Sequence, residues 1–134
     1  MTTEAEKESF LTQLRSQVGN TGDTITARDA VNQSTIRNWC DAVSESNPQY
    51  LDPEAAEEGP HGQIVAPPAM LQVWSMPGLI MGQQPQRSKD PSSATYAMLD
   101  EAGFVSVVAT NVEYVFHRYL KLGDVISGRT KLVD

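Results

Sequence analysis

The sequence predicts a single α+β domain, with helices in its first two thirds and strands in its last third. Apolar residues recur at helical spacing in residues 3–18 and 33–43. Residues 105–120 are rich in Val, Tyr and Phe, which favour strands. The length of 134 residues suits one compact domain of roughly 100–150 residues.

The composition narrows the class of protein. Hydrophobic residues make up 40% and charged residues 20% of a chain with net charge −7, which indicates a soluble globular protein. Eleven of the 17 acidic residues lie in residues 1–60. We expect no nucleic-acid partner, because such binding requires a basic face.

Cysteine usage and hydropathy indicate the compartment. Cys40 is the only cysteine, so an intrachain disulfide is excluded and a reducing cytoplasm is expected. No run approaches the roughly 18 apolar residues of a membrane span, and the N-terminus MTTEAEKESF lacks the pattern of a secretion signal. The sequence therefore predicts a cytoplasmic protein without a membrane partner.

Two helices are expected near the N-terminus, with a short strand at Thr24 and Ile25 between them. Thr3 and Glu6 have the spacing of a capping box, and the first helix should run to Gly19. The second should span residues 33–43, begin with Ser34 as N-cap, and end near Glu45 or Ser46 because Pro48 disfavours helix at residue 47. The apolar side chains expected to face the core are Phe10, Leu14, Val18, Ile36, Trp39, Cys40 and Val43.

A heavily apolar central helix is expected between two proline-containing breakers, residues 67–68 and 77–78. It should have about three turns and be buried on all sides, since no charged residue lies between Gly62 and Gln86. Residues 83–93 are expected to form a loop, followed by a helical turn at 96–101 that ends at Gly103.

Residues 105–120 predict one long strand, and residues 125–133 a second strand after a turn at 122–124. Together they should form an antiparallel hairpin. A sheet of two long strands and one short one leaves an exposed edge. We therefore expect further strands from beyond residue 134 or from another chain.

Three motifs occur in the order found in the MaoC-like hydratases and dehydratases, which have the hot-dog fold. They are IRNWCDAVSESNPQYLDPEAA, HGQIVAPPAML and YLKLGDVISGRTKLV, and the resemblance covers about residues 24–133. It implies an antiparallel sheet wrapped around a short central helix and completed by a partner hot-dog subunit. It also implies that residues 1–134 are one domain cut before its last strands, with a further C-terminal domain beyond residue 134.

In active members of this family, an Asp and a His beside the Asn-Pro turn activate the water that adds to a 2-enoyl thioester. This sequence has Glu45 and Tyr50 at those positions, and a phenol with pKa near 10 is a poor base. The resemblance thus implies a degenerate dyad and no catalytic residue in this chain. Asn47 and Pro48 are explained by the shape of the turn.

The other nucleophilic and titratable side chains have structural interpretations. Cys40 on an apolar helix face is expected to be an inert core residue. His61 suits a loop-structural role, with a substitute base as the alternative, and His117 a packed or solvent-facing position in a strand. Neither histidine has a partner at ligand spacing, so no metal site is expected, and the family implies no cofactor.

The chain most resembles the degenerate, N-terminal-dehydratase type of MaoC domain, as in the larger subunits of heteromeric enoyl-CoA hydratases for steroid side chains. This implies a catalytic MaoC-like partner in a hetero-oligomer, a heterotetramer, and a bulky acyl-CoA substrate. The residues expected to bind it come from the turn, the central helix and a basic cluster: Asn47, Pro68, Met70, Leu71, Trp74, Met76, Arg118, Lys121 and Arg129.

Alternatives remain open at this point. The basic cluster can meet phosphates or be a solvated sheet edge, and the apolar residues can be core. The chain can belong to a 3-hydroxyacyl dehydratase of fatty-acid elongation that acts on acyl-carrier-protein thioesters. It can also be an acyl-CoA-binding or scaffolding module without a role in hydration.

Overall fold

The computed structural model describes residues 3–76, 78 and 91–133. The chain divides into two compact units, which we describe separately. The first unit contains residues 1–24, 78–112 and 129–134, and the second contains residues 25–77 and 113–128. The predicted breaker Pro77 and most of the predicted loop, residues 83–90, lie outside the described residues.

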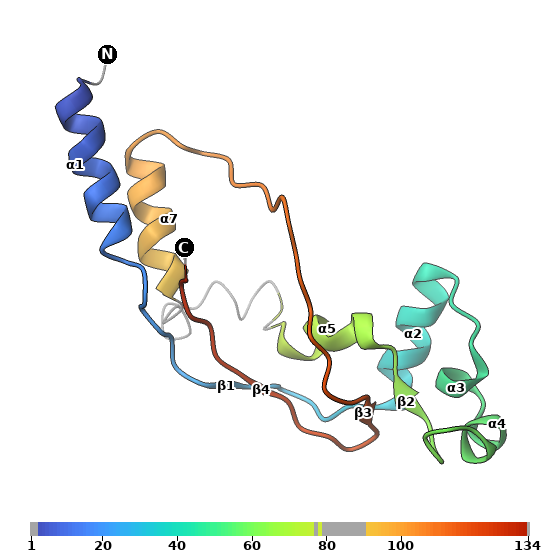
Figure 1. The fold of residues 1–134 in the computed structure, drawn as a ribbon. Helices are drawn as coiled ribbons and strands as arrows, with labels where there is room; N and C mark the ends of the chain where they lie inside the picture. The colour runs from blue at the N-terminus through green and yellow to red at the C-terminus, as the bar shows by residue number, and fades with distance from the viewer. Residues whose placement is uncertain (1–2, 77, 79–90, 134) are drawn as a thin grey trace. The chain divides into compact units, whose positions relative to one another are not determined.

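In the first unit, helices α1 (Glu4–Arg15) and α7 (Pro91–Glu101) lie side by side (Figure 1). The predicted capping box is confirmed, because Glu6 N–H donates to Thr3 Oγ1 at 3.2 Å and Thr3 N–H to the Glu6 carboxylate at 2.6 Å. The expected end of α1 was wrong, because this helix stops four residues before Gly19. The expected start of α7 was also wrong, because this helix includes residues 91–93 of the predicted loop.

In the second unit, helix α2 (Gln33–Val43) covers the residues whose apolar spacing predicted it, but its N-cap and its end differ from the prediction. The Asn32 side chain, not Ser34, accepts the Thr35 N–H at 2.9 Å. The helix ends earlier than expected because Ser44 adopts a left-handed conformation with φ 59°. Two short helices that we did not predict follow, α3 (Pro48–Leu51) and α4 (Pro53–Glu58), and each begins with a proline after an Asn or Asp N-cap.

The central helix consists of a 3₁₀ turn (Pro68–Met70) followed by α5 (Leu71–Ser75). It contributes two residues to the core of the second unit, whose buried cluster consists of Val31, Ile36, Cys40, Ala56, Ile64, Ala66, Met70 and Trp74. The expectation of burial on all sides was wrong in this structure. Leu71 is only half-buried and Met76 is 62% exposed, so one side of the helix is uncovered.

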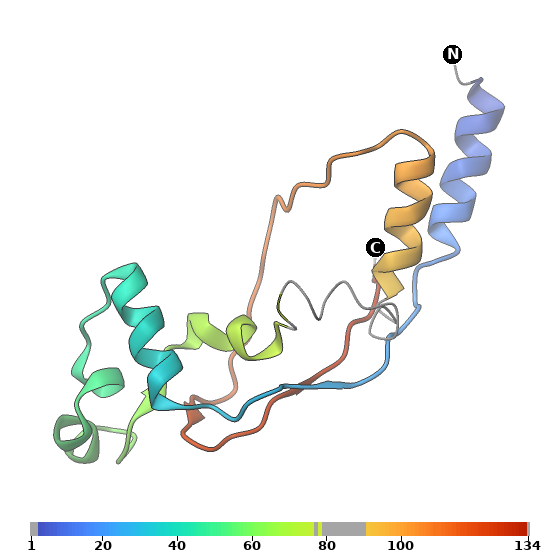
Figure 2. The same ribbon diagram turned by 180° about the vertical axis from the view of Figure 1, so that it is seen from behind.

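Two short antiparallel ladders stand in place of the predicted hairpin. Strand β1 (Ile25–Thr26) pairs with β4 (Ser127–Gly128), and β2 (Val65–Ala66) pairs with β3 (Leu120–Lys121). Figures 1 and 2 both show β1 beside β4. The predicted turn at residues 122–124 forms, but the hairpin prediction was wrong, because the backbone of residues 124–126 pairs with residues 27–31 instead. The Ala27 N–H donates to the Ile126 carbonyl at 2.7 Å, and the Val31 N–H donates to the Asp124 carbonyl at 2.9 Å.

Most of the predicted long strand is extended chain without a ladder. Residues 104–119 are assigned to no strand, and many of their large apolar side chains are exposed, with Val105 at 82% and Val115 at 71%. Strand structure needs a hydrogen-bonded neighbour. The described residues supply that neighbour only for Leu120 and Lys121.

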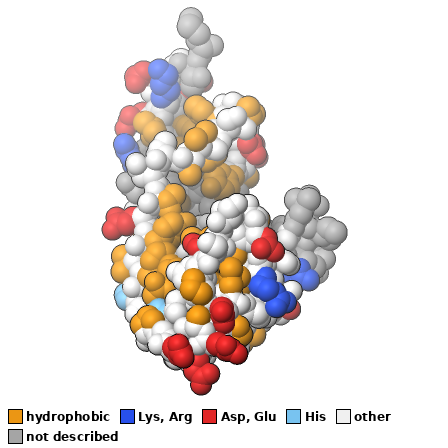
Figure 3. Space-filling view, turned by 90° about the vertical axis from the view of Figure 1, so that its right-hand side faces the viewer, with side chains coloured by type: hydrophobic (Ala, Val, Ile, Leu, Met, Phe, Trp, Pro, Cys, Tyr) orange, Lys and Arg blue, Asp and Glu red, His pale blue; other side chains and the backbone are white. Residues whose placement is uncertain are grey.

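Acidic side chains gather on one side of the second unit. Figure 3 shows them at the lower end of the face that includes α4. Asp52, Glu54, Glu57 and Glu58 are all exposed there. Such a face repels phosphate groups, and the expected absence of a nucleic-acid partner stays a prediction.

Candidate functional site

The Asn-Pro turn between α2 and α3 lies between Glu45 and Tyr50, the residues that the resemblance to the MaoC-like family places at the dyad positions. The Glu45 carboxylate accepts the Asn47 backbone N–H at 2.8 Å, and the Asn47 side chain accepts the Gln49 N–H at 3.0 Å. Asn47 is therefore the N-cap of α3. The turn-shaping role expected for Asn47 and Pro48 is visible in this geometry, and Glu45 supports the same turn.

Tyr50 lies half-buried on α3, against the core cluster. Its backbone carbonyl accepts the Gln33 side-chain amide at 3.0 Å, which ties α3 to the start of α2. Burial is the main cause that raises the pKa of the Tyr50 phenol above its ordinary value. Further causes are the nearby charges of Tyr119 and Glu45. Tyr50 thus stays a neutral phenol at physiological pH.

The aromatic rings of His61 and Tyr119 form a pair near Tyr50. The His61 ring, in the turn after α4, lies with its centroid 4.3 Å from that of Tyr119 at an interplanar angle of 44°. The structure therefore gathers Tyr50, Tyr119 and His61 into one cluster, which we call the tyrosine cluster. His61 packs on a ring within it, in agreement with the loop-structural interpretation.

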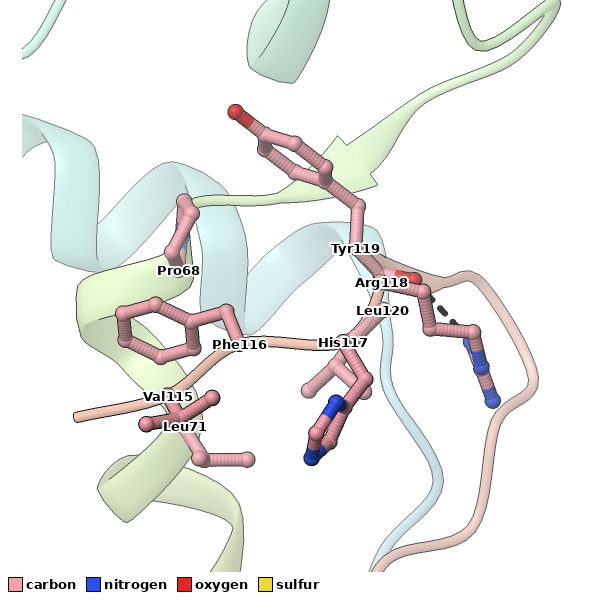
Figure 4. A pocket seen from close by; sticks show the side chains of 8 residues that line it. All are labelled: Pro68, Leu71, Val115, Phe116, His117, Arg118, Tyr119 and Leu120. Atoms are coloured by element: carbon pink, nitrogen blue, oxygen red, sulfur yellow. Dashed lines mark hydrogen bonds between the residues drawn. The ribbon is translucent and has the colours of Figure 1, made fainter.

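An apolar pocket of about 200 Å³ lies between the central helix and the segment that leads into β3 (Figure 4). Its lining residues are Pro68, Leu71, Val115, Phe116, His117, Arg118, Tyr119 and Leu120. The sequence analysis named three of them, Pro68, Leu71 and Arg118, as candidate substrate-binding residues. Tyr119 belongs to both the pocket and the tyrosine cluster, so the pocket lies next to that cluster.

The other predicted residues of the central helix lie elsewhere. Met70 is completely buried in the core. Trp74 is 6% exposed and lines a separate hollow of about 90 Å³ with Arg28, Asp29, Thr35 and Val73. Met76 is exposed. The roles of these three residues in substrate binding stay predictions.

The predicted basic residues have different surroundings. Arg118 Nη1 donates to the Asp124 carboxylate at 2.5 Å and to the Tyr119 carbonyl at 2.9 Å. The hydrogen bond from Arg118, followed by that from the Lys121 N–H at 2.8 Å, holds the pKa of Asp124 below its usual value. Lys121 and Arg129 are exposed, and Arg129 belongs to the first unit. A phosphate-binding role for these cations stays a prediction.

Sequence reasoning missed five lining residues of the pocket: Val115, Phe116, His117, Tyr119 and Leu120. They were assigned to a strand, and His117 was given a packed or solvent-facing position. The available signal was the concentration of aromatic side chains in residues 114–119.

Cys40 is completely buried, and burial raises the pKa of its thiol, in agreement with an inert core residue.

Two features are absent from the described part of the chain. No group of three or more His, Cys, Asp or Glu side chains there could hold a metal ion. None of the helices described in this structure is long and apolar enough to cross a membrane.

The chain is similar to a dehydratase-region family and to proteins named as enoyl-CoA hydratase subunits. Residues 16–134 match the family described as "FAS1-like, dehydratase domain region". The chain is 47% identical over 108 residues to the 3-oxo-4,17-pregnadiene-20-carboxyl-CoA hydratase alpha subunit of Mycobacterium tuberculosis, which covers 81% of this chain and 34% of the relative. It is 40% identical over 121 residues to a Thermomonospora curvata protein named "Probable enoyl-CoA hydratase alpha subunit", covering 90% of this chain and 38% of that protein.

A solved structure agrees with these relatives. The crystal structure of the ChsH1–ChsH2 complex from Mycobacterium tuberculosis contains a chain with TM-score 0.81 and 38% identity, and the match covers 98% of this chain and 71% of that one. This likeness confirms the predicted α+β hot-dog fold. The chain spans about a third of the length of the two curated relatives.

Proposed function

Because the chain belongs to the family of FAS1-like dehydratase domain regions, we propose that it is the non-catalytic, substrate-binding part of a heteromeric 2-enoyl-CoA hydratase. Its substrate is a bulky steroid acyl-CoA, and a partner hot-dog subunit supplies the Asp/His dyad. The reaction class and the steroid are suggested by the names of the curated relatives. The partner is suggested by the two-component complex that contains the structural relative.

The observation that carries the non-catalytic role is the state of Tyr50. Hydration of a 2-enoyl thioester needs a base for the attacking water and an acid for the α-carbon, and both must work near neutral pH. A phenol whose pKa is raised above 10 is ionised in fewer than about one molecule in a thousand at pH 7. Tyr50 therefore cannot provide the base.

Glu45 is the remaining candidate base, and its position argues against that role. Its Oε1 accepts the Asn47 N–H at 2.8 Å, which gives the carboxylate a place in the local turn. The described residues offer no imidazole hydrogen bond to Glu45, and His61 instead packs against Tyr119. A working dyad would need such a pair of groups aimed at one water.

The short central helix supports the proposed bulky substrate. Its α-helical part has only five residues, and the apolar pocket opens beside its first turn. A volume of about 200 Å³ is below the roughly 300–1,000 Å³ of sites for drug-sized ligands. The pocket can therefore hold part of a large acyl group, and a partner subunit would supply the rest of the tunnel.

The test is an assay of the chain alone and of its complex with a co-encoded hot-dog partner, on steroid and linear enoyl-CoA substrates. The proposal predicts turnover only by the complex, with the steroid preferred. Preference for linear enoyl thioesters on acyl carrier protein would favour a fatty-acid dehydratase. Tight acyl-CoA binding without turnover by the complex would favour a binding or scaffolding module.

A further inference from the structure

The indole N–H of Trp74 is a buried hydrogen-bond donor that lacks a partner. Trp74 belongs to α5 and to the core cluster of the second unit, and it is only 6% exposed. Its Nε1 is buried and forms no hydrogen bond with the described residues. Nearly all buried polar groups in folded proteins bond to a protein atom or to an ordered water, because an unpaired one is costly. Trp74 therefore requires an acceptor from outside the described side chains and backbone.

A small hollow adjoins this indole. It has a volume of about 90 Å³ and is lined by residues of the second unit alone, namely Arg28, Asp29, Thr35, Val73 and Trp74. Three parts of the chain meet there: the loop at residues 28–29, the first turn of α2, and α5. Figures 1 and 2 both show α5 beside α2. A molecule in this hollow can therefore contact all three parts.

The rest of the lining offers acceptors to an occupant. The backbone N–H and the Oγ1 hydroxyl of Thr35 both donate to Asn32 Oδ1 at 2.9 Å. The single hydroxyl proton of Thr35 is thus used, and its oxygen can only accept a further bond. Asp29 is exposed, and its carboxylate also only accepts. Arg28 already has an interaction partner. The hollow thus combines one unpaired donor with two acceptors.

This combination selects the kind of occupant. The occupant must accept the Trp74 N–H and donate to Thr35 or to Asp29. A neutral O–H group does both, whereas an ammonium group cannot accept and an anion is repelled by Asp29. A volume of about 90 Å³ exceeds the roughly 10–15 Å³ that one water needs. It is far below the roughly 300–1,000 Å³ of sites for drug-sized ligands, so water fits and a part of a large substrate does not.

We propose that this hollow is a binding site for an ordered water that accepts the Trp74 N–H and donates to Thr35 Oγ1 or to the Asp29 carboxylate. The site is separate from the proposed function, because it shares no residue with the apolar pocket. The water joins α5 to the first turn of α2. Since Leu71 of α5 lines the apolar pocket, the water also helps to position the helix that forms one wall of that pocket.

The first test is a crystal structure of the full chain, alone or with its hot-dog partner, at a resolution that shows ordered waters. We expect a water oxygen about 2.7–3.2 Å from Trp74 Nε1, with a second hydrogen bond to Thr35 or Asp29. The matched control Trp39→Phe changes the other tryptophan and should leave this water in place. A direct bond from Nε1 to a protein oxygen, such as an inward-turned Asp29, would overturn the proposal, as would the absence of any oxygen within that distance.

The second test looks for the same water in solution. The chain has two tryptophans, so ¹⁵N labelling of the indoles gives two N–H signals, and Trp39→Phe alone assigns them even if Trp74→Phe does not fold. A bound water should give the Trp74 N–H a nuclear Overhauser effect from water with the sign of a long-lived contact. Thr35→Val excludes relay through the threonine hydroxyl proton, and the effect should persist because Asp29 remains. Its absence, or its loss in Thr35→Val, would contradict the proposal.

Discussion

Asp124 anchors the bend at residues 117–118, before β3, and removing its side chain should destabilise the second unit. Asp124→Ala deletes the ion pair with Arg118 and the bond from the Lys121 N–H. The arginine side chain is 60% exposed and that of the aspartate 25%, so the ion pair is worth about 0.2–1 kcal/mol. With the loss of a carboxylate–amide bond of about 1 kcal/mol, unfolding should become easier by about 1–2 kcal/mol.

Urea unfolding at pH 7 and thermal unfolding measure this loss. A change of about 1–2 kcal/mol corresponds to a Tm lower by roughly 3–8 °C for a domain of this size. The folded-state pKa of Asp124 is depressed, so its stabilisation is present above the unfolded pKa near 3.9 and is lost as the pH falls through the folded value. The difference between wild type and variant should therefore be constant from pH 7 to pH 5 and shrink toward pH 3.

Two controls separate the contributions. Arg118→Gln removes the ion pair but keeps the Lys121 bond, so it should cost less than half as much as Asp124→Ala. Asp100→Asn, at an exposed site on α7, should change the free energy of unfolding by less than about 0.5 kcal/mol. If Asp124→Ala matched this control, or if its effect did not diminish in acid, the role assigned to Asp124 would be wrong.

Three further predictions concern the helix that precedes the site and the degenerate dyad. Asn32→Ala should lower the stability by about 1 kcal/mol, measured by urea unfolding, because it removes the acceptor of the Thr35 N–H at the N-cap; an equal effect of Ser34→Ala would contradict this. The Cys40 thiol, which is completely buried, should react with a thiol reagent only in urea, and rapid labelling of the native chain would refute its burial. Tyr50 should remain mostly protonated at pH 10, since burial raises its pKa; a difference absorbance titration of wild type against Tyr50→Phe checks this, and ionisation at or below pH 10 would contradict it.

The local parts of the fold could be predicted from the sequence because local chemistry determines them. The position of α2 follows from its apolar spacing, although its end was placed too late, and the capping box of α1 follows from Thr3 and Glu6. The N-cap of α2 was placed wrongly because Asn32 and Ser34 are both good caps and spacing alone does not choose between them. The Asn-Pro turn was also predictable, because Asn47 and Pro48 mark the start of α3, whereas the assignment of Glu45 and Tyr50 to degenerate dyad positions stays a prediction.

The parts that could not be predicted depend on contacts between residues distant in the chain. Tyr119 lies near Tyr50 and His61 because β3 pairs with β2, and β2 has no strong strand pattern in the sequence. Residues 105–120 do have that pattern, but a strand needs a neighbour, and the described residues pair only the last of them. The sheet edge that would accept this segment is not encoded within it.

The central claim is that this chain contributes no acid–base group to hydration. The most direct test is the steady-state turnover number of the complete complex on a steroid enoyl-CoA, with one site changed at a time. Glu45→Gln keeps an oxygen acceptor for the Asn47 N–H, so we expect turnover within about threefold of wild type, whereas replacing the dyad histidine of the partner subunit should lower it at least a hundredfold, the scale of general acid–base catalysis. A loss of that size from Glu45→Gln, with the partner's histidine dispensable, would show that the chemistry resides in this chain.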